Sequence, residues 1–309
     1  MRSLLLFVWV LGLLCAVYVN AHDLNDSLRA DYASIEVDAN TQSREFLTVV
    51  QMQELFTFVR RHPVVSLESL AIYDPTGEIG FCYGRAMAVH LRARQMGLKS
   101  SRIRKLFIIG DLREGADPEW RFHVTTLVQG PGDQWYAVDP VLAYLSTDPA
   151  TTAVPEATWI RRVRETWDGD RRARLFRTDP KSIVPDISTF PATPADENGD
   201  RIVEFSFDPR LKPGFVETPV GSESVFELNS QAQDIYFLTA NRFDFVKLDI
   251  HVLNQGVQSE TTYAYRDYFK RLLDSLLGRP AQPFPMRPRA TVTPPQLLQN
   301  RLFSPRFRR

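Results

Sequence analysis

The sequence predicts an α+β fold, in which a helix packs on an antiparallel sheet, and three observations lead to this prediction. After Cys82, a stretch rich in Ala, Leu, Met and Arg has its apolar residues at helical spacing. The apolar run over residues 102–110 is typical of a buried strand. Two further β-rich segments, over residues 120–128 and 134–139, flank a turn rich in Gly and Pro and predict a hairpin. A helix followed by such a meander is an α+β arrangement.

Residues 1–21 are typical of a cleaved export signal. Arg2 precedes an apolar stretch over residues 4–19, and the chain then offers a small-residue cleavage site at Ala21. We therefore expect a secreted or periplasmic protein with no transmembrane segment after cleavage. Cys15 lies inside this signal, so Cys82 would be the single thiol of the mature chain, with no partner for an internal disulfide.

Composition excludes some function classes. The formal net charge of the 309 residues is zero, which argues against a dominant polyanionic partner, so no specific nucleic-acid binding is indicated. The sequence contains no P-loop, no GxGxxG after a strand, no HExxH and no paired CxxC. We therefore expect no cofactor and no metal ion.

On composition and periodicity the chain divides into six parts. The first three are a signal peptide (1–21), an N-terminal segment with an amphipathic helix (22–61) and a core (62–185). They are followed by a loop or linker (186–200), a C-terminal α+β region (201–278) and a basic tail rich in Pro and Arg (279–309). The tail lacks acidic residues and is expected to be disordered and able to hold an acidic partner. The C-terminal region offers no constellation to which chemistry can be assigned.

Residues 156–177 are expected to form a helix with an arginine-rich face. Such a face can dock an acidic protein, but a solvated helix surface is the commoner explanation of a charge run.

Cys82 stands at or next to a helix N-terminus, where unpaired N–H groups and the helix dipole favour a thiolate. A thiolate nucleophile needs a base. His90 is too far away, because eight residues of helix separate it from Cys82 by about 12 Å. His123 lies on a predicted strand and is followed by a hairpin, and Asp139 ends the next strand.

Folding this hairpin about Pro131-Gly132 brings Asp139 opposite His123 or one residue away, within reach of the imidazole. The two side chains share a face if the loop has three residues or a bulge, and a plain two-residue turn would separate them. Asp111 is a rival for the same role but lies across a longer loop. The order Cys, His, Asp fits a nucleophile, a base and an orienting carboxylate. The alternative is a small buried cysteine, a sheet histidine and an aspartate that ends a strand.

The segments FCYGRA, RKLFIIGDL, WRFHVTTLV and WYAVDP, in this order and spacing, resemble bacterial protein glutaminases (protein-glutamine deamidases). The resemblance covers about residues 70–145 and implies a papain/transglutaminase-like core with a C-terminal extension. It also implies that Cys82 is the nucleophile, His123 the general base and acid, and Asp139 the residue that orients His123. Phe81 departs from the family pattern, which usually has glycine there.

The resemblance implies a secreted cysteine hydrolase that deamidates protein-bound glutamine to glutamate through a thioester and releases ammonia. Val141 is a second departure from the family pattern, in which a serine is common at that position. Tyr83, Arg85 and Trp120 are expected to support the oxyanion or the site. The triad chemistry by itself leaves a transglutaminase and a cysteine peptidase open, and a non-catalytic binding module with a vestigial site is a further alternative.

Overall fold

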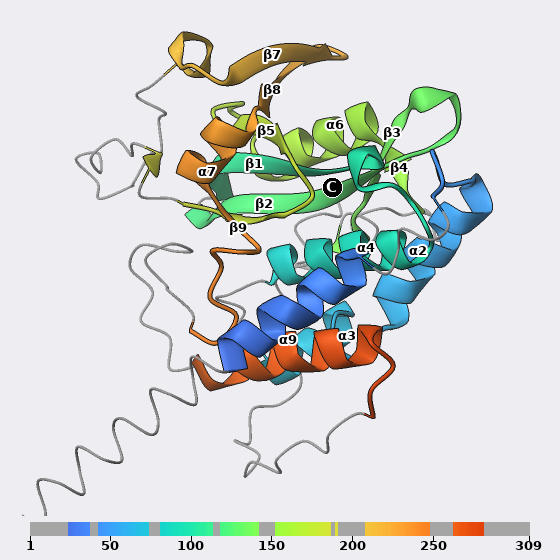
Figure 1. Cartoon of the computed structure of the whole chain (residues 1–309). Helices are drawn as coiled ribbons and strands as arrows, with labels where there is room; N and C mark the ends of the chain where they lie inside the picture. Colours follow the sequence, from blue (N-terminus) through green and yellow to red (C-terminus); the bar gives the residue numbers. More distant parts are fainter. Residues whose placement is uncertain are drawn as a thin grey trace, which may run out of the picture.

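A computed structural model describes residues 24–37, 43–73, 81–113, 118–141, 152–186, 189–190, 208–247 and 262–280 (Figure 1). The predicted signal, most of the predicted linker and nearly all of the predicted tail lie outside these ranges. Helices pack on a mixed sheet, which confirms the α+β prediction. The papain/transglutaminase-like core and the division into six parts stay predictions. Within the described ranges, no helix is long and apolar enough to cross a membrane.

The main sheet has seven strands in the order β4-β3-β2-β1-β5-β8-β7. The strands are β1 (Ile103–Arg113), β2 (Pro118–Gln129), β3 (Trp135–Val138), β4 (Val154–Pro155), β5 (Arg174–Thr178), β7 (Phe215–Val220) and β8 (Glu223–Leu228). Neighbouring strands are antiparallel except β5 and β8, which are parallel. The antiparallel pairing predicted for the meander is confirmed for β1, β2 and β3, and the parallel pair of β5 and β8 lies outside that meander. A separate two-stranded sheet pairs β6 (Ser182–Pro185) with β9 (Phe237–Thr239).

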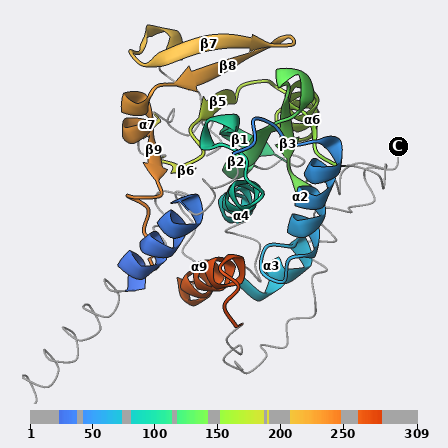
Figure 2. The same cartoon turned by 45° about the vertical axis from the view of Figure 1, so that its right-hand side comes forward.

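Helix α4 (Cys82–Gln95) lies against one face of the main sheet, as both views show (Figures 1 and 2). Two strand residues hold the beginning of its second turn, since Lys105 Nζ and Thr126 Oγ1 each donate to the Ala86 carbonyl over 2.5 Å. Lys105 Nζ also donates to Thr126 Oγ1 over 2.8 Å. All three partners are buried. The start of α4 is therefore held to the centre of the sheet by a small polar network.

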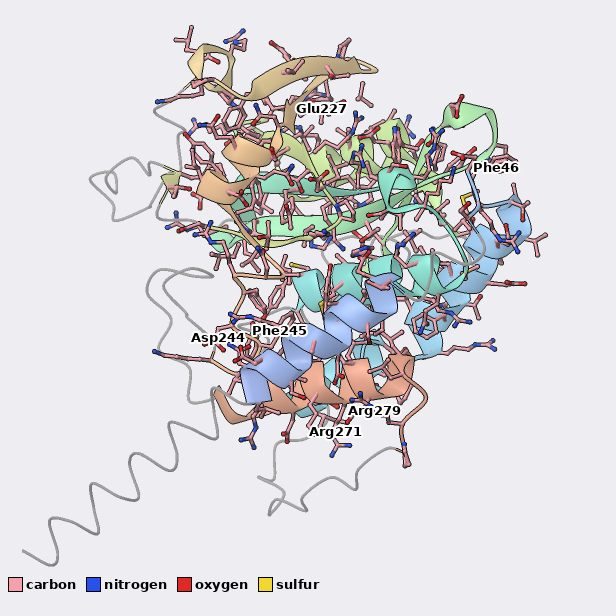
Figure 3. The ribbon with its side chains drawn as sticks, in the orientation of Figure 1. Phe46, Glu227, Asp244, Phe245, Arg271 and Arg279 are labelled. Carbon is pink, nitrogen blue, oxygen red and sulfur yellow. The ribbon has the colours of Figure 1, made fainter. Side chains whose placement is uncertain are left out.

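A second layer of helices covers the outer side of α4 (Figure 2). It contains α9 (Thr262–Leu276), α3 (Leu67–Tyr73), α2 (Val49–Arg61) and a helix over residues 24–37. Phe245 packs between two members of this layer, with its ring centroid 5.2 Å from that of Phe269 on α9 and 6.3 Å from that of Tyr32 (Figure 3). Because α4 is enclosed between the layer and the sheet, nearly all of its residues are buried.

Charged and polar side chains tie the helix over residues 24–37 to the end of α9 and to α4. Arg279, just beyond α9, donates to both carboxylate oxygens of Asp31, at 2.6 and 2.7 Å (Figure 3). Glu36 pairs with His90 and with Arg94, whose Nε lies 3.2 Å from Glu36 Oε2. The N-terminal segment is thus held to the C-terminal half of α4 by contacts of Glu36 with two buried side chains.

Helix α6 (Glu156–Trp167) lies on the opposite side of the sheet from α4 (Figure 1). The predicted helix over residues 156–177 is too long, because Asp168 accepts the N–H groups of Arg172 and Ala173 in a turn that leads into β5. The prediction of an arginine-rich helix face is also partly wrong. Arg164 is buried and pairs with Asp168 and Glu223, so its charge is used inside the protein.

Candidate active site

Cys82 is the first residue of α4 and is 8% exposed. It is a free thiol in the structure. The residue before it, Phe81, is the N-cap and has φ 46° and ψ 26°, which is the left-handed region. The chain therefore turns sharply into the helix at Cys82, and the first N–H groups of α4 have no acceptor within the helix.

The hairpin between β2 and β3 brings His123 and Asp139 onto one face of the sheet. Pro131, Gly132 and Asp133 form a three-residue turn, and β2 and β3 pair symmetrically about Gly132, from Gln129↔Trp135 to Thr126↔Val138. Continuing this register places Asp139 level with Thr125, two residues from His123. Asp139 is predicted to lie opposite His123 or one residue away, and the structure places it two residues away. The three-residue turn does give the shared face that the prediction required.

The imidazole of His123 lies between a carboxylate and a thiol. Its Nε2 is 2.7 Å from Asp139 Oδ2, and the side chain of Cys82 is close enough to interact with the ring. Because Asp139 holds Nε2, the nitrogen left for the thiol is Nδ1. The structure thus brings together all three residues that the sequence predicts as a triad.

Asp139 is held in place by two further donors. Trp159 of α6 donates its indole N–H to Oδ2 over 2.9 Å. The backbone N–H of Val141 donates to Oδ1 over 3.0 Å. Both carboxylate oxygens are therefore engaged, and the carboxylate is fixed relative to His123.

Two tryptophans of α6 surround the imidazole. The ring of Trp159 is nearly parallel to that of His123, with centroids 6.0 Å apart, and the ring of Trp167 meets it edge-on at 4.9 Å. His123 faces α6 because successive side chains of a strand point to opposite faces of the sheet. Thr126 points to α4, so His123, three residues earlier, points to the face that α6 covers. Strand β3 ends opposite Thr126, so β2 has no β3 neighbour beside His123, and the first turn of α4 reaches the imidazole there.

The charges of the site favour a protonated imidazole. Burial lowers the pKa of His123, but the charge of Asp139 and hydrogen bonds with Asp139 and Cys82 outweigh it and raise this pKa to about 9. Burial raises the pKa of Asp139, but the charge and hydrogen bond of His123, the Trp159 hydrogen bond and the charge of Arg85 outweigh it, so this pKa lies below its ordinary value.

The three residues predicted to support the site have different positions. Arg85 is buried one turn after Cys82, near enough for its charge to act on Asp139, and within the described part of the chain its Nη1 has no hydrogen-bond partner. Tyr83 is 1% exposed and packs among aromatic rings, with its centroid 5.9 Å from that of Phe81. The side chain of Trp120 lies outside the described residues, and its backbone pairs with Leu112.

Trp159 is a site residue that the sequence did not identify. Trp159 lies in the helix predicted from residue 156, but no signal in the sequence showed that this helix covers His123. The rival orienting residue, Asp111, lies on β1, and it is Asp139 that contacts His123. Over the residues that the structure describes, no group of His, Cys, Asp and Glu side chains could hold a metal ion.

Comparisons with known proteins find similarity at the level of structure only. No protein family matches the sequence, and no curated protein matches it. A crystal structure of protein-glutaminase is similar at 14% identity, with 52% of this chain and 82% of that chain covered and a TM-score of 0.32.

Two further solved structures are similar over about half of each chain. The crystal structure of pro-protein-glutaminase is 16% identical, with 54% of this chain and 56% of that chain covered and a TM-score of 0.31. The A47Q2 mutant of pro-protein-glutaminase is 16% identical, with 46% of this chain and 52% of that chain covered and a TM-score of 0.31.

Proposed function

We propose that this chain is a cysteine hydrolase that deamidates glutamine side chains of proteins or peptides. The observation that supports it most directly is the contact of His123 Nε2 with Asp139 at 2.7 Å, which leaves the other imidazole nitrogen for Cys82. The choice of glutamine follows from the resemblance of the four sequence segments to protein glutaminases. The export-signal pattern of residues 1–21 supports action outside the cytoplasm.

In the first half of the proposed reaction, the Cys82 thiolate attacks the carboxamide carbon and forms a C–S bond. The carbonyl oxygen becomes an oxyanion in the tetrahedral intermediate. His123, as imidazolium, then gives its proton to the nitrogen, and the C–N bond breaks to release ammonia and leave a thioester.

In the second half, water attacks the thioester carbon while neutral His123 accepts a proton from it. The C–S bond breaks, which regenerates the thiolate and the imidazolium and releases the glutamate side chain. Asp139 keeps the imidazole in the correct tautomer and orientation in both halves. One amide and one water are consumed, and one carboxylate and one ammonium ion are formed.

The oxyanion would be stabilised by backbone N–H groups at the start of α4. A left-handed residue followed by a helical one, as at Phe81 and Cys82, turns successive N–H groups toward a common point and forms an anion-binding concavity. The N–H of Cys82 lies in this concavity next to its own thiol. Preorganised donors of this kind stabilise an oxyanion in the transition state.

The proposal is tested by ammonia release from casein, with the purified protein compared with Cys82→Ala and His123→Ala. Release that is lost in both variants, with new glutamate and no cleavage or cross-links in the same tubes, is the expected result. Cross-links to lysine would indicate a transglutaminase, and cleavage would indicate a peptidase. No release, together with slow alkylation of Cys82, would contradict the proposal and favour a binding module with a vestigial site.

A further inference from the structure

The residue before the proposed nucleophile has a strained backbone. Phe81 has φ 46° and ψ 26°, a region in which a bulky side chain is a genuine outlier because its Cβ crowds the backbone. Conformations of this kind persist only where the surrounding structure holds them. Phe81 is fully buried, so the residues that pack on its ring supply that restraint.

Much of the restraint comes from α9, which lies far along the chain. The ring centroid of Tyr268 is 4.3 Å from that of Phe81, and the centroid of Tyr265 is 6.1 Å away. Both tyrosines are fully buried. Figure 2 shows α9 running beside α4 on the side away from the sheet. The left-handed turn that leads into Cys82 is thus packed against the C-terminal helix.

The Tyr268 ring also lies directly on the first turn of α4. A Cβ added to Gly84 would be only 2.5 Å from Tyr268 Oη and 2.7 Å from its Cζ, closer than real Cβ contacts. The ring cannot easily move away, because Tyr73 meets it edge-on with centroids 5.3 Å apart. Gly84 therefore provides the space that Tyr268 fills.

The hydroxyl end of Tyr268 is close to the charges of the site. Burial raises the pKa of Tyr268, the charge of Arg85 lowers it, and Tyr73 and Cys82 raise it further, so the phenol is neutral. Among the described residues, the Tyr268 hydroxyl and Arg85 Nη1 are both buried without a hydrogen-bond partner. The tyrosine therefore contributes its ring rather than a charge to the start of α4.

We propose that Tyr268 is a positioning residue for Cys82, whose ring holds Phe81 in the left-handed conformation and fixes the first turn of α4. The thiolate and the N–H groups of the concavity are thereby aimed at His123 and at the substrate. This inference rests on the proposed function of Cys82. It gives the C-terminal region, to which the sequence assigned no chemistry, a part in the active site.

The test uses the full-length protein and two readouts, the rate of Cys82 alkylation by iodoacetamide between pH 5 and 10, and kcat and KM for ammonia release. Tyr268→Leu is expected to lower kcat about tenfold or more with KM within about twofold, since small misplacements of reacting groups have large effects on rate. It is also expected to change the pH dependence of alkylation. Tyr268→Phe keeps the ring and should stay close to wild type.

Phe245→Leu is the matched control, because it removes a buried aromatic ring from the same helix layer without touching the first turn of α4. It should lower thermal stability while the alkylation profile stays that of wild type. If Tyr268→Leu does not fold, a second pair of variants tests whether Cys82 needs a left-handed conformation at residue 81. Phe81→Gly and Phe81→Ala both remove the ring, but only glycine adopts the left-handed region freely, so Cys82 should react about threefold or more faster in the glycine variant.

The outcomes separate the two proposals. An alkylation profile in Tyr268→Leu identical to wild type, or Phe81→Ala as reactive as Phe81→Gly, would overturn the positioning role. A wild-type protein that releases no ammonia, but whose Cys82 alkylation changes in Tyr268→Leu, would reject the deamidase and retain the positioning role.

Discussion

Trp159 donates its indole N–H to Oδ2 of Asp139 over 2.9 Å, and the same oxygen lies 2.7 Å from Nε2 of His123. One carboxylate oxygen therefore links α6 to the imidazole that faces Cys82. Because all of these groups are buried, the hydrogen bond of Trp159 fixes a negative charge in a site of low dielectric constant, where it acts strongly on His123.

We predict that Trp159→Phe, which keeps the ring stacked on His123 but removes the donor, lowers kcat/KM for ammonia release by about tenfold. A hydrogen bond to a charged group contributes about 1.5–3 kcal/mol, and about 1.4 kcal/mol corresponds to tenfold. Trp135→Phe is the control, since Trp135 lies on β3 with Arg104 5.7 Å from its ring centroid. Equal kcat/KM values for the two variants would show that the indole N–H is unimportant.

The raised pKa of His123 predicts the pH range of the site. Its imidazolium forms beside Asp139, so the stability that it contributes is fully present below the unfolded pKa of about 6.5 and is lost as pH rises through about 9. The rate of ammonia release should fall over the same alkaline range.

We predict that Asp139→Asn moves the alkaline limit to lower pH, because it removes the charge that raises the pKa of His123. Ammonia release measured from pH 5 to 10 would show the shift. Asp133→Asn is the matched change in the exposed hairpin turn and should leave the profile as in wild type. Identical profiles for the two variants would argue against control of His123 by Asp139.

Glu36→Gln should destabilise the protein at neutral pH. Burial raises the pKa of Glu36, but hydrogen bonds and charges of His90 and Arg94 outweigh it and lower the pKa to about 2. The stability that Glu36 contributes is therefore present above its ordinary pKa and is lost as pH falls toward 2. We expect the variant to lose about 2–4 kcal/mol in the free energy of unfolding at pH 7, since it leaves buried Arg94 without its counter-charge.

Urea denaturation at pH 7 and pH 3 checks this expectation, and the difference from wild type should be smaller at pH 3. Glu45→Gln serves as control, because Glu45 pairs with Lys99 and Arg102 at the surface and its removal should have no measurable effect. A Glu36→Gln difference that is the same at both pH values would contradict the role of its charge.

Lys105 offers a test of the polar network under α4. Burial lowers the pKa of this lysine well below its ordinary value, so the ammonium is costly in the folded protein. We predict that Lys105→Met, which fills the same volume, leaves the free energy of unfolding within about 1 kcal/mol of wild type. Lys105→Ala should lose about 2 kcal/mol or more, because it opens a cavity between the sheet and α4.

Denaturation of the two Lys105 variants in urea at pH 7 gives the comparison. If methionine is as destabilising as alanine, the hydrogen bonds of Lys105 to Ala86 and Thr126 are worth more than the volume of the side chain.

Local patterns in the sequence were enough to predict the elements that carry Cys82, His123 and Asp139. The helical spacing after Cys82 and the β-rich runs around the Pro131-Gly132 turn depend on neighbouring residues, which sequence periodicity reports directly. The register of the hairpin depended on the turn, and the sequence could only state that three residues would be needed for a shared face.

Features set by distant packing could not be predicted. The contact of Trp159 with Asp139 joins two elements through the fold, and the ring of Tyr268 reaches Phe81 from α9. The departure of Phe81 from the glycine of the family pattern was visible in the sequence, but the sequence could not show that a phenylalanine there has φ 46° and is held by an aromatic neighbour. The early end of α6 depends on Asp168 accepting two N–H groups, which periodicity does not report.

The position of α9 bears on how the protein is made. A nascent chain that has left the ribosome as far as residue 261 already contains Cys82, His123 and Asp139, yet it lacks the helix that packs on Phe81 and Gly84. Until the residues of α9 are available, the rings of Phe81 and Tyr83 lack the aromatic neighbours that this helix gives them. We therefore expect that shortening the chain before Thr262 would keep Cys82, His123 and Asp139 but leave the start of α4 without its cover.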